Sequence, residues 1–365
     1  MSKVGIHETI AHLNRIATAV PEHDAHGEFL EFAQHSLGSE RERALFRRMA
    51  RQAQIDHRYS VLSSDECFAG GAVRSGRFYV YGRFPTTAER MRVFEKHAAA
   101  LAVSAIEKLQ LGARLARITH LIVTSCTGMM APGIDLEIVA QCGLSSSVER
   151  TCIGFMGCYA GVIALKFAHH IVRSEPSARV LIVNLELCSL HLQETSDIEQ
   201  LLSLMVFADG CSASVVSADP VGFAIDGFHA AVIPDTSSLI TWHVGDSGFN
   251  MFLSGRVPAS ISLGLADYRD AILNGATPSS IDMWAVHPGG RSVLDAVAKS
   301  LQLNSDALAV SRGVLKDYGN MSSATVMFVL ESLLKTARAG ERGCGMSFGP
   351  GLTAETFLFH KAADQ

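Results

Sequence analysis

GCYAGVIALKFA, residues 157–168, gives the first indication of how this chain folds. Small residues surround Cys158 and an apolar segment follows directly, which predicts a buried helix with a thiol in its first turn. The unpaired N–H groups and the dipole at the start of a helix favour negative charge. We therefore expect the pKa of the Cys158 thiol to be lowered, so that the nucleophilic thiolate is favoured.

The same order of residues recurs near the C-terminus. Gly319 and Asn320 are followed by small residues and then by the apolar helical segment 325–335. This repetition predicts two duplicated halves whose central helices face each other. We place the halves at residues 1–218 and 219–365, so that the cysteine lies in the first half and Asn320 in the second.

Segments of two kinds alternate along the chain. Apolar runs rich in β-branched residues predict buried strands, and apolar residues at helical spacing predict helices. The predicted strands are 118–124, 178–186 and 281–286, and the predicted helices are 87–109, 292–301 and much of the charge-rich first sixty residues. Strands that alternate with helices indicate an α/β fold built of layers.

Composition and charge exclude several classes of protein. Hydrophobic residues make up 48% of the 365 residues and charged residues 18%, which is typical of a globular chain with a large core. The net charge of −5 gives no basic field for nucleic acid. No apolar run approaches the roughly 18 residues of a membrane span, and the N-terminus lacks the apolar core of a signal peptide. We therefore expect a cytoplasmic protein.

The eight cysteines are scattered and form no C-x-x-C pair. This pattern speaks against a zinc ribbon and against a disulfide framework. Reduced thiols in the cytoplasm are the simpler interpretation, and no metal site is expected.

Two further polar residues stand at topologically matched positions. His287 ends the predicted strand 281–286, beside Pro-Gly-Gly, at the strand end where α/β folds place their chemistry. Asn320 follows a glycine at a helix start. Each residue has an ordinary alternative, since cysteines pack well in cores and asparagines cap helices. The order Cys158, His287, Asn320 at matched positions nevertheless predicts a catalytic set.

The three side chains suggest a particular kind of chemistry. His287 can hold the proton of Cys158 or stabilise the thiolate, and Asn320 supplies an amide donor. Both donors can also stabilise an enolate or a tetrahedral oxyanion. A neutral amide, where many hydrolases carry Asp, adds no repelling charge to such an anion. The set therefore favours carbon–carbon bond formation over hydrolysis.

Four motifs stand in the order GCYAG at 157–161, WAVHPGG at 284–290, YGNMSS at 318–323 and FGPGLT at 348–353. Together they resemble the type III polyketide synthases, the chalcone synthase-like enzymes, from about residue 40 to the C-terminus. The resemblance implies an α/β, thiolase-like αβαβα layered fold made of two duplicated halves. It also implies a homodimer.

The reaction that the resemblance implies is iterative decarboxylative condensation of malonyl-CoA onto an acyl-CoA starter. Cys158 would take the starter acyl group. His287 and Asn320 would promote decarboxylation of malonyl-CoA and stabilise the enolate. The substrates are CoA thioesters, and no further cofactor is expected.

The resemblance also points to substrate-binding positions. Phe207 matches the family's gatekeeping phenylalanine, with a plain core residue as the alternative. Gly349, Pro350 and Gly351 form a loop whose backbone can approach a ligand closely. Arg48 matches a CoA-contacting basic position, with Arg47 and Arg51 as helpers, and a solvated helix face is the alternative.

Four positions depart from the plant enzymes. Met251 replaces the second gatekeeping phenylalanine and makes the passage more adaptable. Trp242 replaces a glycine of the cavity wall and narrows the space. Cys126 occupies a small polar position, either as a cavity-lining residue or as a buried inert thiol. Ala131 stands where many plant members place a methionine that crosses the dimer interface.

These departures favour a bacterial-type enzyme that makes alkylpyrones or alkylresorcinols from fatty acyl-CoA starters. The apolar residues Leu190, Leu192, Met251 and Ala131 support that choice, whereas Trp242 favours phenolics built from malonyl-CoA alone, of the phloroglucinol or tetrahydroxynaphthalene type. A fatty-acid-initiating 3-ketoacyl synthase shares the catalytic logic but normally carries His-Gln-Ala-Asn. A catalytically silent binding protein of the same fold and a cysteine hydrolase are weaker alternatives.

Overall fold

The computed structural model describes residues 9–63 and 77–363. One nine-stranded sheet runs through this part of the chain, with the strand order β11-β12-β13-β8-β1-β7-β6-β4-β5. Its strands are β1 (His12–Ala19), β4 (His120–Ser125), β5 (Glu149–Gly154), β6 (Arg179–Leu187), β7 (Asp209–Ser217), β8 (Phe223–Val232), β11 (Met283–Val286), β12 (Arg342–Gly349) and β13 (Thr353–Lys361). Cys67 lies outside the described residues.

The sheet consists of two parts that meet at β1 and β8. β1 pairs with β7 along its length but with β8 only through His12 with Ala224 and Leu13 with Phe223. The predicted strands in the two parts are confirmed as β4, β6 and β11. The helical interpretation of the first sixty residues is wrong at β1, because pairing with strands on both sides overrides the local pattern.

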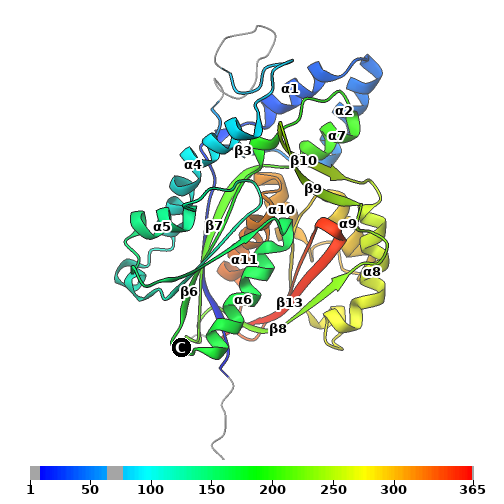
Figure 1. Cartoon of the computed structure of the whole chain (residues 1–365). Helices are drawn as coiled ribbons and strands as arrows, with labels where there is room; N and C mark the ends of the chain where they lie inside the picture. Colours follow the sequence, from blue (N-terminus) through cyan, green and yellow to red (C-terminus); the bar gives the residue numbers. More distant parts are fainter. Residues whose placement is uncertain (1–8, 64–76, 364–365) are drawn as a thin grey trace, which may run out of the picture.

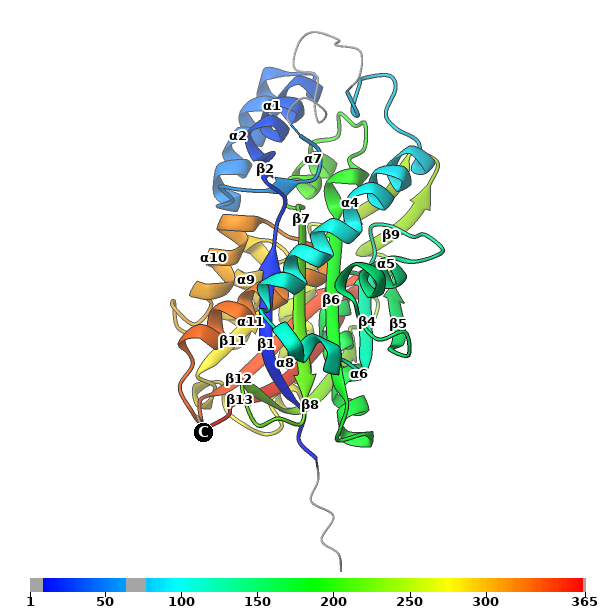
Figure 2. The same ribbon diagram turned by 90° about the vertical axis from the view of Figure 1, so that its left-hand side faces the viewer.

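Helices form three layers around the two parts of the sheet (Figures 1 and 2). α4 (Thr87–Lys108) and α5 (Ile134–Cys142) cover the outer face of the N-terminal part, and α6 (Ala160–Ser174) and α11 (Thr325–Thr336) lie between the parts. α8 (Val257–Ile272) and α9 (Arg291–Ser300) cover the outer face of the C-terminal part, with α10 (Ala309–Tyr318) beside α9 and α11. The helices predicted at 87–109 and 292–301 are confirmed as α4 and α9.

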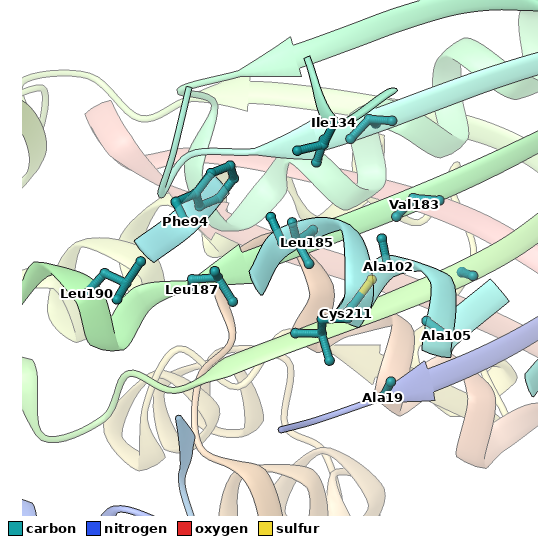
Figure 3. Close-up of a cluster of buried hydrophobic side chains, with 14 of the residues drawn as sticks. Ala19, Phe94, Ala102, Ala105, Ile134, Val183, Leu185, Leu187, Leu190 and Cys211 are labelled. Atoms are coloured by element: carbon teal, nitrogen blue, oxygen red, sulfur yellow. The ribbon is translucent and has the colours of Figure 1, made fainter. Parts of the chain in front are cut away.

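Alternation of side chains along each buried strand produces these layers. In β6, Val183 belongs to the outer core under α4 (Figure 3), whereas Val180 and Ile182 face α6 and α11. In β11, Ala285 faces the central helices and Trp284 faces the outer core under α8 and α9. Two outer cores and one middle core around α6 and α11 therefore hold five layers together, in agreement with the predicted thiolase-like αβαβα fold.

Small elements gather at one end of the molecule (Figures 1 and 2). They are β2 (His23–Asp24), α1 (His26–Ser36), α2 (Glu40–Ala53), β3 (Tyr59–Ser60), α7 (Ile198–Leu204) and the hairpin of β9 (Ile240–Gly245) and β10 (Gly248–Leu253). None of the helices within the described ranges is long and apolar enough to cross a membrane. The division of the chain at residue 218 falls between β7 and β8 and stays a prediction.

Candidate active site

Cys158 lies in a short 3-10 turn, Gly157–Tyr159, just before the first turn of α6. Gly157 has φ +67°, and a Cβ atom at this position would overlap the ring of Pro350. Glycine is therefore required both for the backbone conformation and for the close approach of the two loops. This arrangement holds Cys158 against the loop that follows β12.

The three predicted catalytic residues line one cavity between the two halves of the chain. The cavity holds about 1210 Å³ of space between protein atoms, part of it open to solvent. The sulfur of Cys158 lies 4.0 Å from Oδ1 of Asn320. Both ring nitrogens of His287 are buried and have no hydrogen-bond partner within the described residues. Buried polar atoms without a partner are costly, so the ring is available for a substrate.

The amide of Asn320 is oriented by its own loop. Its Oδ1 accepts hydrogen bonds from the backbone N–H of Ser322, at 2.9 Å, and from the hydroxyl of Thr325, at 3.3 Å. Its Nδ2 therefore points the other way, and lies 3.4 Å from the carbonyl oxygen of Gly289. This orientation presents a donor on the side of the histidine-bearing loop.

Burial governs the protonation of the thiol and the imidazole. Burial raises the pKa of Cys158 to about 11, and the nearby carboxyl group of Glu186 raises it further. Burial lowers the pKa of His287 to about 3. The expectation of a lowered thiol pKa is therefore wrong, because desolvation outweighs the favourable field at the helix start. At neutral pH both groups are neutral, so an ion pair forms only when the thiol proton moves to the imidazole.

Most of the predicted substrate-binding residues line the same cavity. They are Phe207, Met251, Trp242, Cys126, Gly349 and Pro350. Trp242 lies opposite Met251 in the β9–β10 hairpin, and its indole Nε1 donates a hydrogen bond of 2.7 Å to the carbonyl oxygen of Cys126. The ring also packs edge-on against His191 and Phe249. Trp242 is therefore a fixed part of the wall.

The sequence matches the chalcone and stilbene synthases over most of its length. Their N-terminal domain matches residues 6–220 and their C-terminal domain matches residues 226–363. The chain belongs to this family. It is a type III polyketide synthase, an acyltransferase-type enzyme that condenses malonyl-CoA. The match to both domains of the family favours this assignment over the 3-ketoacyl synthase alternative.

Known proteins resemble this polyketide synthase in sequence and in fold. "Alpha-pyrone synthesis polyketide synthase-like Pks18" of Mycobacterium tuberculosis is 35% identical over 298 residues, which cover 78% of this chain and 76% of Pks18. PKS-I from the brown alga Ectocarpus siliculosus has a TM-score of 0.86 at 29% identity, covering 98% and 100% of the two chains. The type III polyketide synthase domain of Steely1 from Dictyostelium has a TM-score of 0.86 at 24% identity, covering 97% and 100%, and shows the fold alone.

Four residues named in the sequence analysis, Gly351, Arg48, Leu190 and Ala131, do not line the cavity. Gly351 has φ +73° and shapes the loop without lining the cavity. Arg48 is exposed on α2 and does not line the cavity, whereas Arg47 and Arg51 border a separate surface groove. The role of Arg48 in CoA binding stays a prediction. Leu190 lies in the outer core under α4 rather than in the cavity wall (Figure 3).

A buried carboxyl group beside the cavity was not predicted. Glu186 lies one residue before the end of β6 and accepts hydrogen bonds from Cys126 N at 3.0 Å, Cys126 Sγ at 3.1 Å and Ser323 Oγ at 2.5 Å. Burial raises the pKa of Glu186 and of the Cys126 thiol, whose pKa the Glu186 charge raises further. Cys126 is therefore a protonated thiol held by Glu186. The one sequence signal was a charged residue within the apolar strand 178–186.

Proposed function

We propose that this polyketide synthase loads a fatty acyl group from acyl-CoA onto Cys158 and extends it with malonyl-CoA. The observation that carries this proposal is the largely apolar wall of the cavity that also contains the three polar residues. Its side chains come from both halves of the chain and are Leu192, Leu204, Ile240, Leu253, Val257, Ile261 and Val293. Such a wall stabilises an alkyl chain by about 0.8 kcal/mol for each CH₂ group that it removes from water.

Loading begins at the thiol. The proton of Cys158 passes to a ring nitrogen of His287, and the sulfur attacks the carbonyl carbon of the acyl-CoA. The bond between that carbon and the CoA sulfur breaks, and the CoA sulfur takes the proton back from His287. The products are an acyl thioester on Cys158 and free CoA thiol.

Extension uses malonyl-CoA in the same cavity. The bond between its carboxylate and its methylene carbon breaks, CO₂ leaves, and the electron pair forms an enolate. N–H groups of His287 and Asn320 stabilise the enolate oxygen. The enolate carbon then attacks the acyl carbonyl, and the released pair returns to the sulfur of Cys158, leaving a β-ketoacyl-CoA. No prosthetic group takes part in this scheme.

Pyrone or resorcinol rings are the products that we favour. The name of Pks18, which refers to alpha-pyrone synthesis, supports a pyrone. The fixed indole of Trp242 narrows the cavity and supports the second candidate, a phenolic built from malonyl-CoA alone. Incubation with malonyl-CoA and a series of acyl-CoA starters, read by mass spectrometry, distinguishes them. Products from malonyl-CoA alone, or from aromatic starters alone, would contradict the fatty acyl proposal.

A homodimer and a cytoplasmic location complete the proposal. β5 is the edge strand of the sheet and most of its residues are exposed, and the nearby Met129 and Leu136 are 55% and 41% exposed. A second copy of the chain would cover this edge. The free thiols of the cysteines in the described ranges support a reducing compartment. Sedimentation of the purified enzyme as a monomer at micromolar concentration would contradict the dimer.

A further inference from the structure

Arg58 is a buried cation in the wall of the cavity. It follows α2, directly precedes β3 and is only 6% exposed. Its Nη1 donates a hydrogen bond of 2.6 Å to the carbonyl oxygen of Phe207, and its Nε donates one of 2.9 Å to Nδ1 of His26. The guanidinium carbon lies 4.5 Å from the centre of the Phe29 ring. The guanidinium group is therefore held from several sides.

The carbonyl group that Arg58 binds belongs to a segment paired with the catalytic loop. Phe207 and Asn320 form a parallel β-bridge, in which Asn320 N donates to Val206 O at 2.7 Å and Ala208 N donates to Asn320 O at 2.9 Å. A displacement of the Phe207 peptide therefore displaces the backbone of Asn320. The hydrogen bond from Arg58 to this one carbonyl oxygen therefore helps to fix the positions of both Phe207 and Asn320.

Arg58 also touches the catalytic loop directly. A Cβ atom on Gly319 would lie 2.8 Å from Cγ of Arg58, so the aliphatic stem occupies the space beside this glycine. Gly319 has φ +71°, a conformation that side chains disfavour, and it immediately precedes Asn320. The stem and the guanidinium group therefore support the segments on both sides of the bridge.

The other end of Arg58 is fixed as well. Its backbone N–H donates a hydrogen bond of 3.1 Å to Oδ1 of Asp24, and its carbonyl oxygen accepts one of 2.8 Å from Ala25 N. Burial lowers the pKa of His26 to about 4, and the charge of Arg58 lowers it further, so Nδ1 of His26 stays an acceptor. An anchored backbone and a neutral acceptor give the guanidinium group one orientation.

We propose that Arg58 is a positioning residue that sets the place of the Asn320 amide and of the Phe207 gate during decarboxylation of malonyl-CoA. This inference rests on the proposed roles of Cys158, His287 and Asn320. Arg58 acts on extension rather than on loading, because its contacts lead to Asn320 and not to Cys158.

The test compares two partial reactions in Arg58→Met, which keeps the stem length but removes the donors. Loading is measured as the mass added to the protein by an acyl-CoA starter, and decarboxylation as acetyl-CoA formed from malonyl-CoA alone. We expect kcat for decarboxylation to fall about 100-fold, because a small misplacement of a catalytic group has an effect of this size. The rate of loading should stay within about threefold of wild type. Arg58→Lys keeps a cation and one donor group, so its decarboxylation should fall about 10-fold.

Arg90→Met is the matched control. Arg90 is buried as well, and its Nη1 donates hydrogen bonds to the carbonyl oxygens of Leu190 and Leu192 rather than to that of Phe207. General destabilisation in this variant should lower both partial reactions together. If Arg58→Met also lowers both in parallel, or neither, the positioning role is wrong. A raised KM for malonyl-CoA at unchanged kcat would make Arg58 a substrate-binding residue instead and would equally overturn the proposal.

Two further outcomes have definite meanings. If Arg58→Met is insoluble, the ratio of the two reactions in Arg58→Lys decides, and a wild-type ratio there overturns the inference. If the wild-type enzyme itself neither loads acyl groups nor decarboxylates malonyl-CoA, the proposed function fails rather than the role of Arg58.

Discussion

Gly161 of α6 lies directly against the carbonyl oxygen of Ser323, so that a Cβ atom on Gly161 would come within 2.5 Å of that oxygen. The contact joins the helix that follows the thiol-bearing turn in one half to the amide-bearing loop of the other. Both are buried, and the obstacle is backbone, which cannot rotate away. The close approach of the two central elements therefore depends on glycine at this position.

Replacement of Gly161 by alanine should lower the free energy of unfolding by about 1–3 kcal/mol, because the new methyl group forces the helix and the loop apart. Urea denaturation monitored by circular dichroism measures this change. Gly313 in α10 is the control, because a Cβ atom there meets nothing within 4 Å. Gly313→Ala should raise the free energy of unfolding by about 0.4–1 kcal/mol. Equal effects of the two substitutions would contradict the contact at Gly161.

Replacement of Cys158 by alanine should lower polyketide formation more than about 10³-fold, because no sulfur remains to carry the acyl group. Decarboxylation of malonyl-CoA should persist, because His287 and Asn320 are retained. Chromatography with mass spectrometry measures both products. Cys152→Ala, in the exposed strand β5, is the control and should keep full activity. Full product from Cys158→Ala would show that another residue is the nucleophile.

Replacement of His287 by glutamine should lower both decarboxylation and condensation by about 10²- to 10⁴-fold, because in the proposed mechanism the ring accepts the thiol proton and donates to the enolate. Rates of acetyl-CoA and product formation at saturating malonyl-CoA test this expectation. A His287→Gln enzyme that decarboxylates at the wild-type rate would remove the imidazole from the mechanism.

The buried neutral His287 should also make stability depend on pH. Its pKa is lowered from 6.5 in the unfolded chain to about 3 in the folded protein. Its contribution to stability is therefore complete above pH 6.5 and is lost as pH falls toward 3. Between pH 5 and 4 the free energy of unfolding should fall about 1.4 kcal/mol per pH unit less steeply in His287→Gln than in wild type. Identical slopes would mean that the folded protein protonates this ring.

Replacement of Trp242 by alanine should widen the cavity and raise kcat/KM for the longest acyl-CoA starters at least about tenfold, because each additional buried methylene contributes to binding. Starter series analysed by mass spectrometry report the change. Trp284→Phe is the control, because Trp284 lies in the outer core and not in the cavity wall. An unchanged range of starters in Trp242→Ala would mean that another residue limits the chain length.

Much of the fold could be predicted because the layers follow from local patterns. Apolar runs predicted β4, β6 and β11, and the helical pattern that begins at Thr87 predicted α4. β1 escaped prediction because its strand character comes from β7 and β8, which lie some two hundred residues further along the chain. A strand that forms because of pairing partners far away in the chain has no local sequence pattern that would predict it.

The cavity could be predicted from motifs, whereas its support could not. Cys158, His287 and Asn320 stand in recognisable strings and line one cavity. Arg58 and Glu186 stand in no such string, and their roles arise from folding partners far away in the chain. The thiol pKa was mispredicted for the same reason, because desolvation depends on the surrounding protein rather than on neighbouring residues in sequence.

The bridge between Phe207 and Asn320 bears on how such an enzyme can be redesigned. Substitutions at position 207 that shift the main chain will carry the amide with them, so altered substrate range and turnover will change together there. Trp242 and Met251 stand on a separate hairpin and share no backbone hydrogen bond with Asn320 within the described residues. Libraries that diversify the hairpin should therefore yield new products with fewer inactive clones than libraries that diversify position 207.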